Sequence, residues 1–151
     1  MADGKTSLTK PMAEMLRPGE ELVGGCKAAG KNAVLKTAVG GLASAAIPGS
    51  RSAGLGAVVP QEKVFWIGAT NQRLVYFGVG AFTSAPKKFR GETALDAVES
   101  VAVTRQTLSR RLSIAFTDGS STVVDLYRAN SPDQLQAALE QLLPGRVTEA
   151  A

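Results

Sequence analysis

The stretch LSIAFTDGSSTVVDL, residues 112–126, decides the fold that we expect. Apolar residues alternate with small or polar ones along both ends of this stretch, as in strands with one buried face. Asp118-Gly119 between them is a strong signal for a tight hairpin turn. The alternating residues are Leu112, Ile114 and Phe116 before the turn and Thr122, Val124 and Leu126 after it. An antiparallel hairpin is therefore predicted here.

A helix is predicted directly after this hairpin. Ser131-Pro132-Asp133-Gln134 has the pattern of a capping box with proline at the first helical position. Pro144-Gly145 ends the helix. Its apolar stripe consists of Leu135, Ala138, Leu139 and Leu142. A single amphipathic helix after a series of strands can bury such a stripe only against the open end or face of their sheet.

Further short strands are predicted upstream of the hairpin, together with a helix near the amino terminus. The helix begins near Leu8, with Pro11 in its first turn, and Pro18-Gly19 ends it. Residues 63–68 form a continuous apolar run, typical of a strand covered on both faces. A shift of phase between Val98 and Val101 predicts a β-bulge. The predicted upstream strands are residues 20–27, 63–68, 73–80, 87–90 and 95–104.

The expected fold class is mainly β, of the α+β type. It is a strongly bent antiparallel sheet, or partly open barrel, of about seven strands with a C-terminal capping helix and a short N-terminal helix. Residues 1–7 and 144–151 are expected to be flexible ends of a single domain over residues 8–143. A Gly/Ala-rich insertion at about 28–60 interrupts that domain, with a marginal helix over 33–47 and a loop over 48–60.

The order of several short motifs resembles the bacterial pleckstrin-homology-like (PH-like) family, which is related in shape to GRAM domains. The likeness covers roughly residues 14–143 apart from the insertion. Its motifs are Leu16-Arg17-Pro18-Gly19-Glu20, Thr70-Asn71-Gln72-Arg73-Leu74-Val75, Leu95-Asp96-Ala97-Val98, Phe116-Thr117-Asp118-Gly119 and the terminal helix. The resemblance implies a PH-like barrel without enzymatic activity and a tendency toward homo-oligomeric rings, in a family largely of unknown function.

Composition narrows the classes of function. The chain has 151 residues, a net charge of +4, one cysteine and no histidine. Without histidine it lacks the commonest general base and metal ligand, so we expect neither an enzyme nor a metal or cofactor site. No apolar run reaches the length of about 18 residues that a membrane span needs. The first residues lack the apolar segment of a signal peptide, so a cytoplasmic protein is expected, with peripheral contact at the inner face of the membrane as an open alternative.

One segment is a near match to a nucleotide-binding loop. Residues 25–32, GCKAAGKN, follow the P-loop pattern and would use Lys31, but Asn32 stands where a hydroxyl residue should hold Mg²⁺. The surrounding meander also lacks the parallel βαβ units of nucleotide-binding folds. A flexible Gly/Ala loop is the favoured interpretation, and nucleotide binding is kept as a lesser alternative.

Basic residues form the other candidate site. They are Lys87, Lys88, Arg90, Arg105, Arg110 and Arg111. Such a group could bind an anion or the headgroups of anionic phospholipids. The alternative is an edge strand that its lysines protect against aggregation, and this interpretation is favoured. The small net charge argues against nucleic acid as a partner.

The insertion supplies the leading hypothesis for function. Its segment 33–47 is rich in small residues, which favour close packing against another helix or subunit over strong membrane anchoring. The candidate contact residues are Leu35, Val39, Leu42 and Ile47. The sequence thus predicts a non-enzymatic interaction module that contacts another protein or assembles with copies of itself. A domain that binds anionic phospholipid is the alternative.

Overall fold

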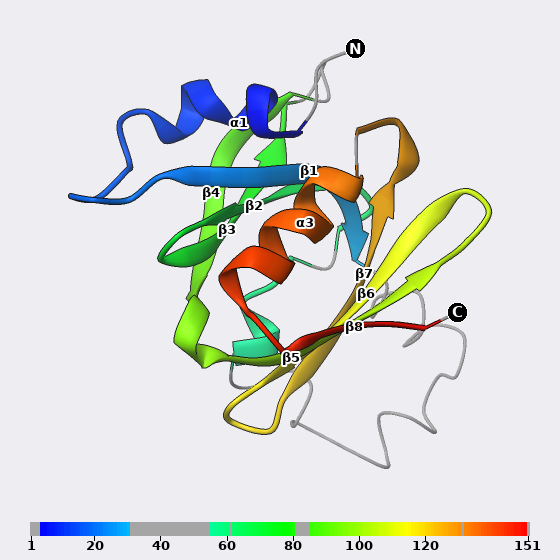
Figure 1. The fold of residues 1–151 in the computed structure, drawn as a ribbon. Helices are drawn as coiled ribbons and strands as arrows, with labels where there is room; N and C mark the ends of the chain where they lie inside the picture. Colours follow the sequence, from blue (N-terminus) through cyan, green and yellow to red (C-terminus); the bar gives the residue numbers. More distant parts are fainter. Residues whose placement is uncertain (1–3, 31–54, 61, 81–84, 131, 151) are drawn as a thin grey trace.

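Within residues 4–30, 55–60, 62–80, 85–130 and 132–150, which the computed structural model describes, eight strands form one sheet in the order β4-β3-β2-β1-β7-β6-β5-β8 (Figure 1). The strands are β1 (Leu22–Gly30), β2 (Phe65–Thr70), β3 (Arg73–Val79), β4 (Pro86–Ala94), β5 (Val98–Arg105), β6 (Ser109–Phe116), β7 (Ser121–Tyr127) and β8 (Val147–Ala150). The helices are α1 (Gly4–Met12) and α3 (Pro132–Leu142), with 3-10 turns η1 (Leu55–Ala57), η2 (Leu95–Ala97) and η3 (Arg128–Asn130). The predicted mainly β, α+β class is confirmed, with a sheet that does not close.

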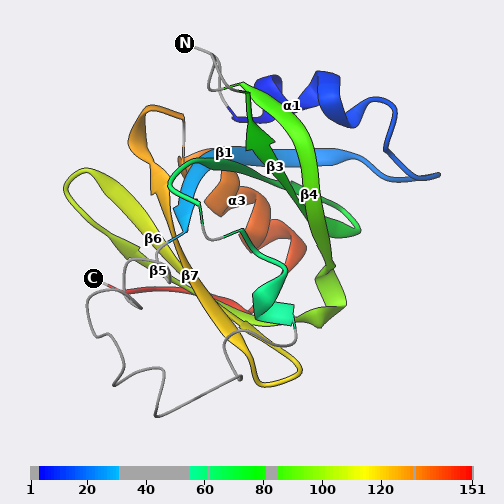
Figure 2. The ribbon, with the colours of Figure 1, turned by 180° about the vertical axis from the view of Figure 1, so that it is seen from behind.

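Strand β1 joins the two halves of this sheet. Its first part, from Leu22 to Ala28, pairs with β2, and its last three residues, Ala28 to Gly30, pair with β7. Strand β1 is thus central in the sheet, with β2, β3 and β4 on one side of it and β7, β6, β5 and β8 on the other. Figures 1 and 2 show α3 lying between these two halves.

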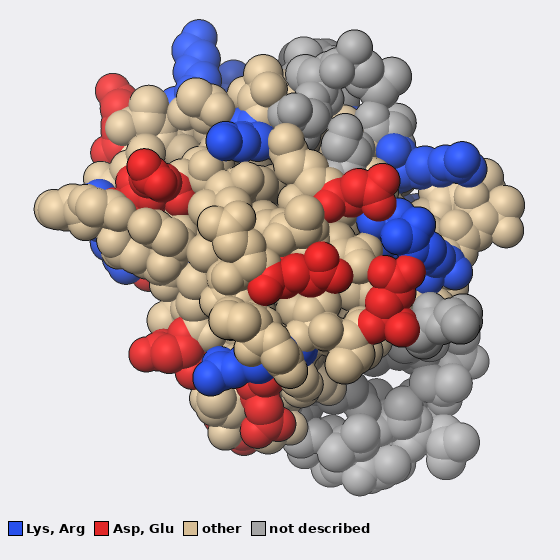
Figure 3. Space-filling view, in the orientation of Figure 1, with Lys and Arg blue, Asp and Glu red and all other residues tan. Residues whose placement is uncertain are grey.

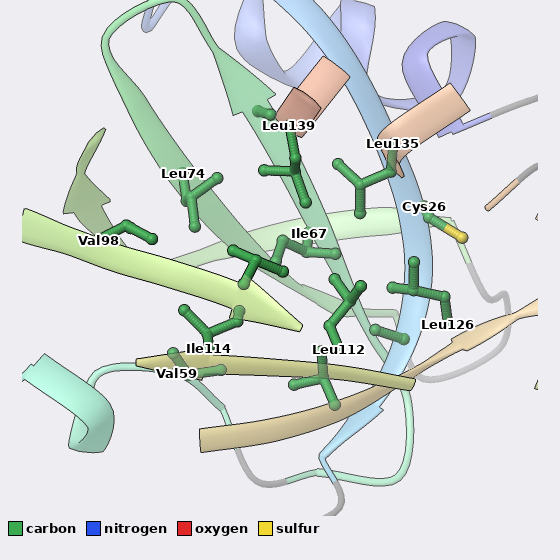
Figure 4. Close-up of a cluster of buried hydrophobic side chains, with 14 of the residues drawn as sticks. Cys26, Val59, Ile67, Leu74, Val98, Leu112, Ile114, Leu126, Leu135 and Leu139 are labelled. Atoms are coloured by element: carbon green, nitrogen blue, oxygen red, sulfur yellow. The ribbon is translucent and has the colours of Figure 1, made fainter. Parts of the chain in front are cut away.

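The main core lies under α3. Leu135 and Leu139 on α3 point toward apolar side chains from both halves of the sheet, including Ile67 and Leu112 (Figure 4). The predicted stripe is confirmed, since Leu135, Ala138 and Leu139 are buried and Leu142 is partly buried against the same core. Burial of each leucine contributes about 1.5–3 kcal/mol, so this helix is held chiefly by its packing.

Glycine at position 24 allows α3 to approach the sheet this closely. A Cβ atom at Gly24 would lie 2.9 Å from the Cβ of Ala138 and 3.1 Å from the carbonyl oxygen of Gln134. Glycine occurs at position 24 of this strand because the close contact between β1 and the helix leaves no room for a side chain.

Helix α1 covers the opposite face of the first half-sheet. Its Leu8 and Met12 pack against Trp66, Val75 and Phe77 in a second apolar cluster. Strand β2 is therefore buried on both faces, as the continuous apolar run predicted. The helix spans Gly4–Met12, so the expected position of Pro11 in the first turn is wrong, and this proline lies near the carboxyl end. Among the described residues, no helix has the length and apolarity needed to cross a membrane.

Several predicted details are confirmed and others need correction. The predicted bulge appears as a register shift between Val98 and Ser100 on β5. The expectation of antiparallel strands alone is wrong, because β8 pairs with β5 in parallel. This strand lies within residues 144–151, where a flexible end was expected. Likewise, the insertion expected over 28–60 begins later, since Ala28–Gly30 belong to β1; residues 31–54 lie outside the described part.

Candidate anion-binding site

A hollow of about 210 Å³ lies beside the tip of the β5–β6 hairpin, η3 and the start of α3. We call it the arginine hollow. It is lined by Arg105, Gln106, Thr107, Ser109, Arg110, Arg128 and Pro132. Three arginines and two hydroxyl-bearing residues therefore line one small space on the surface.

The register of two hairpins brings these residues together. On the β5–β6 hairpin, Arg105 stands directly opposite Arg110. On the β6–β7 hairpin, Ser109 stands opposite Tyr127, so Arg128 follows at the tip of the β5–β6 turn. There the Nη1 atom of Arg128 donates a hydrogen bond of 3.1 Å to the carbonyl oxygen of Thr107. The turn itself is closed by a 2.9 Å hydrogen bond from the amide of Gln106 to the carbonyl oxygen of Ser109.

Arg110 is the most buried of the three arginines, with 8% of its surface exposed. Its Nη1 atom donates to the Oε1 atom of Gln136 at 2.9 Å and lies 2.5 Å from a carboxylate oxygen of Asp133. The side chain of Asp133 is 78% exposed. A weakly solvated guanidinium is thus neutralised by a carboxylate that is itself mostly in water.

Arg105 has a similar arrangement at the rim. Its Nε atom lies 2.5 Å from the Oε2 atom of Glu149 on β8. The other carboxylate oxygen of Glu149 accepts a 2.7 Å hydrogen bond from Gln136, and this bond, followed by the one from Arg105, lowers the pKa of Glu149 below its ordinary value. Two like-charged arginines opposite each other would be destabilising alone. The carboxylates of Asp133 and Glu149 offset that repulsion.

The charge around the hollow is visible on the surface. In Figure 3, lysine and arginine side chains gather around the tip of the β5–β6 hairpin at the right-hand edge, and acidic side chains border them. Three arginines line the hollow, whereas two of them have the carboxylate partners described above. Arg128 donates to a backbone carbonyl oxygen and so keeps its positive charge at the opening, although Glu140 beside Gln136 adds a third carboxylate nearby. An anion is attracted to such a charge most strongly at low salt.

The structure separates the six basic residues that the sequence grouped together. Arg105 and Arg110 line the hollow. Arg111, the next residue along β6, is not among the lining residues and pairs with Asp125 at 3.0 Å. Arg128 was missed, because it stands alone in the sequence between Tyr127 and Ala129. The hairpin register around Asp118-Gly119 is the signal that could have found it.

Lys87, Lys88 and Arg90 lie on β4, at the end of the sheet and separated from β6 by four other strands in the sheet order. The predicted edge strand is confirmed. Register shifts fall at Arg90 and at Lys87, and Arg90 pairs with Glu62 at 2.5 Å. Bulges and lysines are two devices that protect an exposed strand edge from pairing with another strand. These three residues therefore belong to a different surface from the hollow.

The described part of the near match to a P-loop, residues 25–30, is neither the expected flexible loop nor a phosphate-binding loop. Gly25 to Gly30 are part of β1, where they pair with β2 and β7. An extended strand in a ladder cannot wrap its amide groups around a phosphate. Cys26 in this strand is buried, which raises the pKa of its thiol to about 12. Lys31 and Asn32 lie outside the described residues, as do Leu35, Val39, Leu42 and Ile47.

A second arginine cluster lies inside the molecule. We call it the Arg73 cluster, and it consists of Glu20, Thr70, Arg73 and Glu92. Arg73 is 3% exposed and donates to both carboxylate oxygens of Glu20, at 2.8 and 3.1 Å. It also pairs with Glu92, and Thr70 donates to Glu20 at 2.6 Å. This cluster connects the chain before β1 to the β2–β3 turn and to β4.

The electrostatics of the Arg73 cluster are those of a closed structural network. Burial alone would raise the pKa of Glu20, but hydrogen bonds from Arg73, Thr70 and the amide of Arg17 outweigh it and lower that pKa to about 2. The hydrogen bond to Glu20 raises the pKa of Arg73. A buried bidentate pair of this kind holds its partners in a fixed geometry. In the described part of the chain, no group of three or more cysteine or acidic side chains could hold a metal ion.

Comparisons with known proteins add little to these observations. No protein-family model matches the sequence, and no curated protein matches it. One solved structure, the C-terminal domain of an unknown protein from Leishmania infantum, shares 10% identity with a TM-score of 0.45. The match covers 89% of this chain and 93% of that one.

Proposed function

We propose that this chain is a non-enzymatic binding domain that holds a small anionic group, a phosphate or a carboxylate, in the arginine hollow. The observation that carries the proposal is that three arginines from separate segments line one hollow, although only solvent-accessible carboxylates balance their charge. Guanidinium groups bind phosphate and carboxylate through paired, charge-assisted hydrogen bonds.

The size of the hollow limits the ligand. Sites for drug-sized molecules occupy about 300–1,000 Å³. The hollow has about 210 Å³, so it suits a single phosphate ester or carboxylate better than a whole nucleotide. Thr107 supplies a hydroxyl donor for a further oxygen atom of such a group, whereas the Ser109 hydroxyl already donates to the Oε1 atom of Gln106 at 3.0 Å.

The two resident carboxylates set the strength and the salt dependence of binding. An incoming anion competes with Asp133 for Arg110 and with Glu149 for Arg105. The hydrogen bond of Arg128 goes to the uncharged carbonyl oxygen of Thr107, so the charge of its guanidinium can still attract the ligand. Binding should therefore be weak at high ionic strength, since salt screens charges at the surface.

Isothermal titration with inorganic pyrophosphate tests the proposal, with sodium chloride at matched ionic strength as the reference. The wild-type chain should bind pyrophosphate, and Arg128→Gln should weaken binding about tenfold or more, because a charge-assisted hydrogen bond contributes about 1.5–3 kcal/mol. Arg111→Gln is the matched control, since Arg111 neighbours Arg110 but pairs with Asp125. Absence of binding, or equal loss in both variants, would contradict the proposal.

Self-association stays a prediction. The insertion residues that suggested it lie outside the described part of the chain, and the bulges and lysines of β4 disfavour pairing between two copies of that strand. We retain the hypothesis of a contact between copies through residues 33–47. Size exclusion with light scattering measures it directly: a mass of two or more chains supports the contact, and a single-chain mass contradicts it.

A further inference from the structure

The tip of the β5–β6 hairpin carries the most exposed large apolar side chain of the described residues. Leu108 is 79% exposed, whereas the other exposed large apolar side chains reach at most 38%. Its chain neighbours, Thr107 and Ser109, both line the arginine hollow. A prominent leucine and a group of arginines therefore share one short turn.

Position in the turn explains why Leu108 gains nothing from the fold itself. It lies between the last residue of β5 and the first of β6, where polar residues or glycine normally occur. Single exposed apolar residues are common and need no special account. An exposed leucine beside three arginines at the same hairpin tip, however, does require an explanation.

We propose that this hairpin tip docks on a bilayer that contains anionic phospholipid. Leu108 enters the boundary between headgroups and acyl chains, and the phosphate of a lipid headgroup enters the arginine hollow. The inference rests on the proposed function, since it names the source of the anion bound there.

The shape of the tip favours a bilayer over a soluble peptide. Leu108 projects outward from a turn, so its partner must provide the apolar surroundings, which a bilayer offers at every point of its surface. Arginines beside it lie where lipid phosphates would be, and the negative potential of an anionic leaflet attracts them. The lipid phosphate then replaces Asp133 and Glu149 as the partner of Arg110 and Arg105.

Co-sedimentation of the full chain with vesicles tests this inference. The vesicles contain phosphatidylcholine alone or with about 30% phosphatidylserine, at about 0.1 M salt. We expect sedimentation only with the anionic vesicles. Leu108→Ser should weaken it about tenfold through lost apolar burial, and Arg128→Gln by a similar factor.

Two matched control variants test whether the loss of any exposed leucine or of any arginine would have the same effect. Leu16→Ser removes another exposed leucine, which follows α1, and Arg111→Gln removes an arginine that does not line the hollow. Both variants should sediment like the wild type. Equal weakening by Leu16→Ser and Leu108→Ser, or no effect of Leu108→Ser, would overturn the role of the hairpin tip.

Pyrophosphate titration of the same variants separates the two proposals. Leu108→Ser should bind pyrophosphate normally while it loses the vesicles, which supports both. Pyrophosphate binding without vesicle binding overturns the membrane inference and leaves a soluble anionic partner, such as an acidic peptide, for the hollow. If the wild-type chain binds neither pyrophosphate nor anionic vesicles, both proposals are overturned.

Discussion

The two arginine clusters of this molecule contain the same kind of side chain in opposite situations. In the Arg73 cluster, a guanidinium that is 3% exposed meets buried Glu20 and several further acceptors. In the arginine hollow, Arg110 is paired with Asp133, whose side chain is 78% exposed. In the first arrangement the guanidinium is surrounded by its partners, and in the second the carboxylate partner is open to water and solutes.

This difference between the two clusters indicates which arginines of the domain can bind a ligand. A buried ion pair is costly to break, because removal of one partner leaves an uncompensated charge. An exposed pair contributes little to stability and can give way to a competing anion at low cost. Burial of the carboxylate, more than the number of arginines, distinguishes the structural cluster from the candidate site.

The largest expected effect comes from breaking the Arg73 cluster. Arg73→Met leaves the Glu20 carboxylate buried without its partner, so the free energy of unfolding should fall by about 3–5 kcal/mol. Arg128→Met is the matched change in the hollow and should cost less than about 1 kcal/mol. Urea unfolding of both variants measures the difference. Equal losses would mean that the two clusters are not distinct in kind.

The response to acid sharpens the same comparison. The pKa of Glu20 is lowered from 4.5 to about 2 in the folded chain, so its contribution is fully present above about pH 5 and is lost as the pH falls toward 2. The change in pKa corresponds to about 3 kcal/mol. Unfolding free energies measured across this range should drop by about that amount in the wild type. In Glu20→Gln, which is less stable throughout, this part of the drop should be missing.

The smallest expected effect concerns the hollow itself. Asp133→Asn removes the exposed competitor of Arg110, so the affinity for pyrophosphate should rise by up to about fivefold, within the range of exposed ion pairs. Asp125→Asn, which removes the partner of Arg111, should leave the affinity unchanged. Titration calorimetry measures both. A weaker affinity in Asp133→Asn would show that Asp133 does not compete with the ligand.

Local patterns predicted most of the fold. The alternation over residues 112–126 and the apolar stripe of the helix after it depend on neighbours in sequence, and both elements form as expected, while Ser131 of the predicted capping box lies outside the described residues. Strand β8 was missed, because four residues after Pro144-Gly145 carry little pattern and their partner β5 lies far away in the chain. The favoured interpretation of GCKAAGKN as a flexible loop is wrong for Gly25–Gly30, which belong to strand β1, because the pairing of that strand with β2 and β7 leaves no local signal.

The candidate site was predicted only in part, for a similar reason. Arg105 and Arg110 were named from the sequence, but Lys87 and Lys88 were grouped with them because they are also basic. Charge alone does not tell which strands lie side by side. Arg128 and the resident carboxylates enter through tertiary contacts among β6, η3, α3 and β8. Such contacts between distant segments leave no local signal.

Nuclear magnetic resonance of the arginine Nε–H groups during a pyrophosphate titration tests the central claim most directly. The account predicts progressive shifts for Arg105, Arg110 and Arg128, with the signals of Arg73 and Arg111 unchanged. Shifts confined to other arginines, or none at all at saturating pyrophosphate, would contradict it.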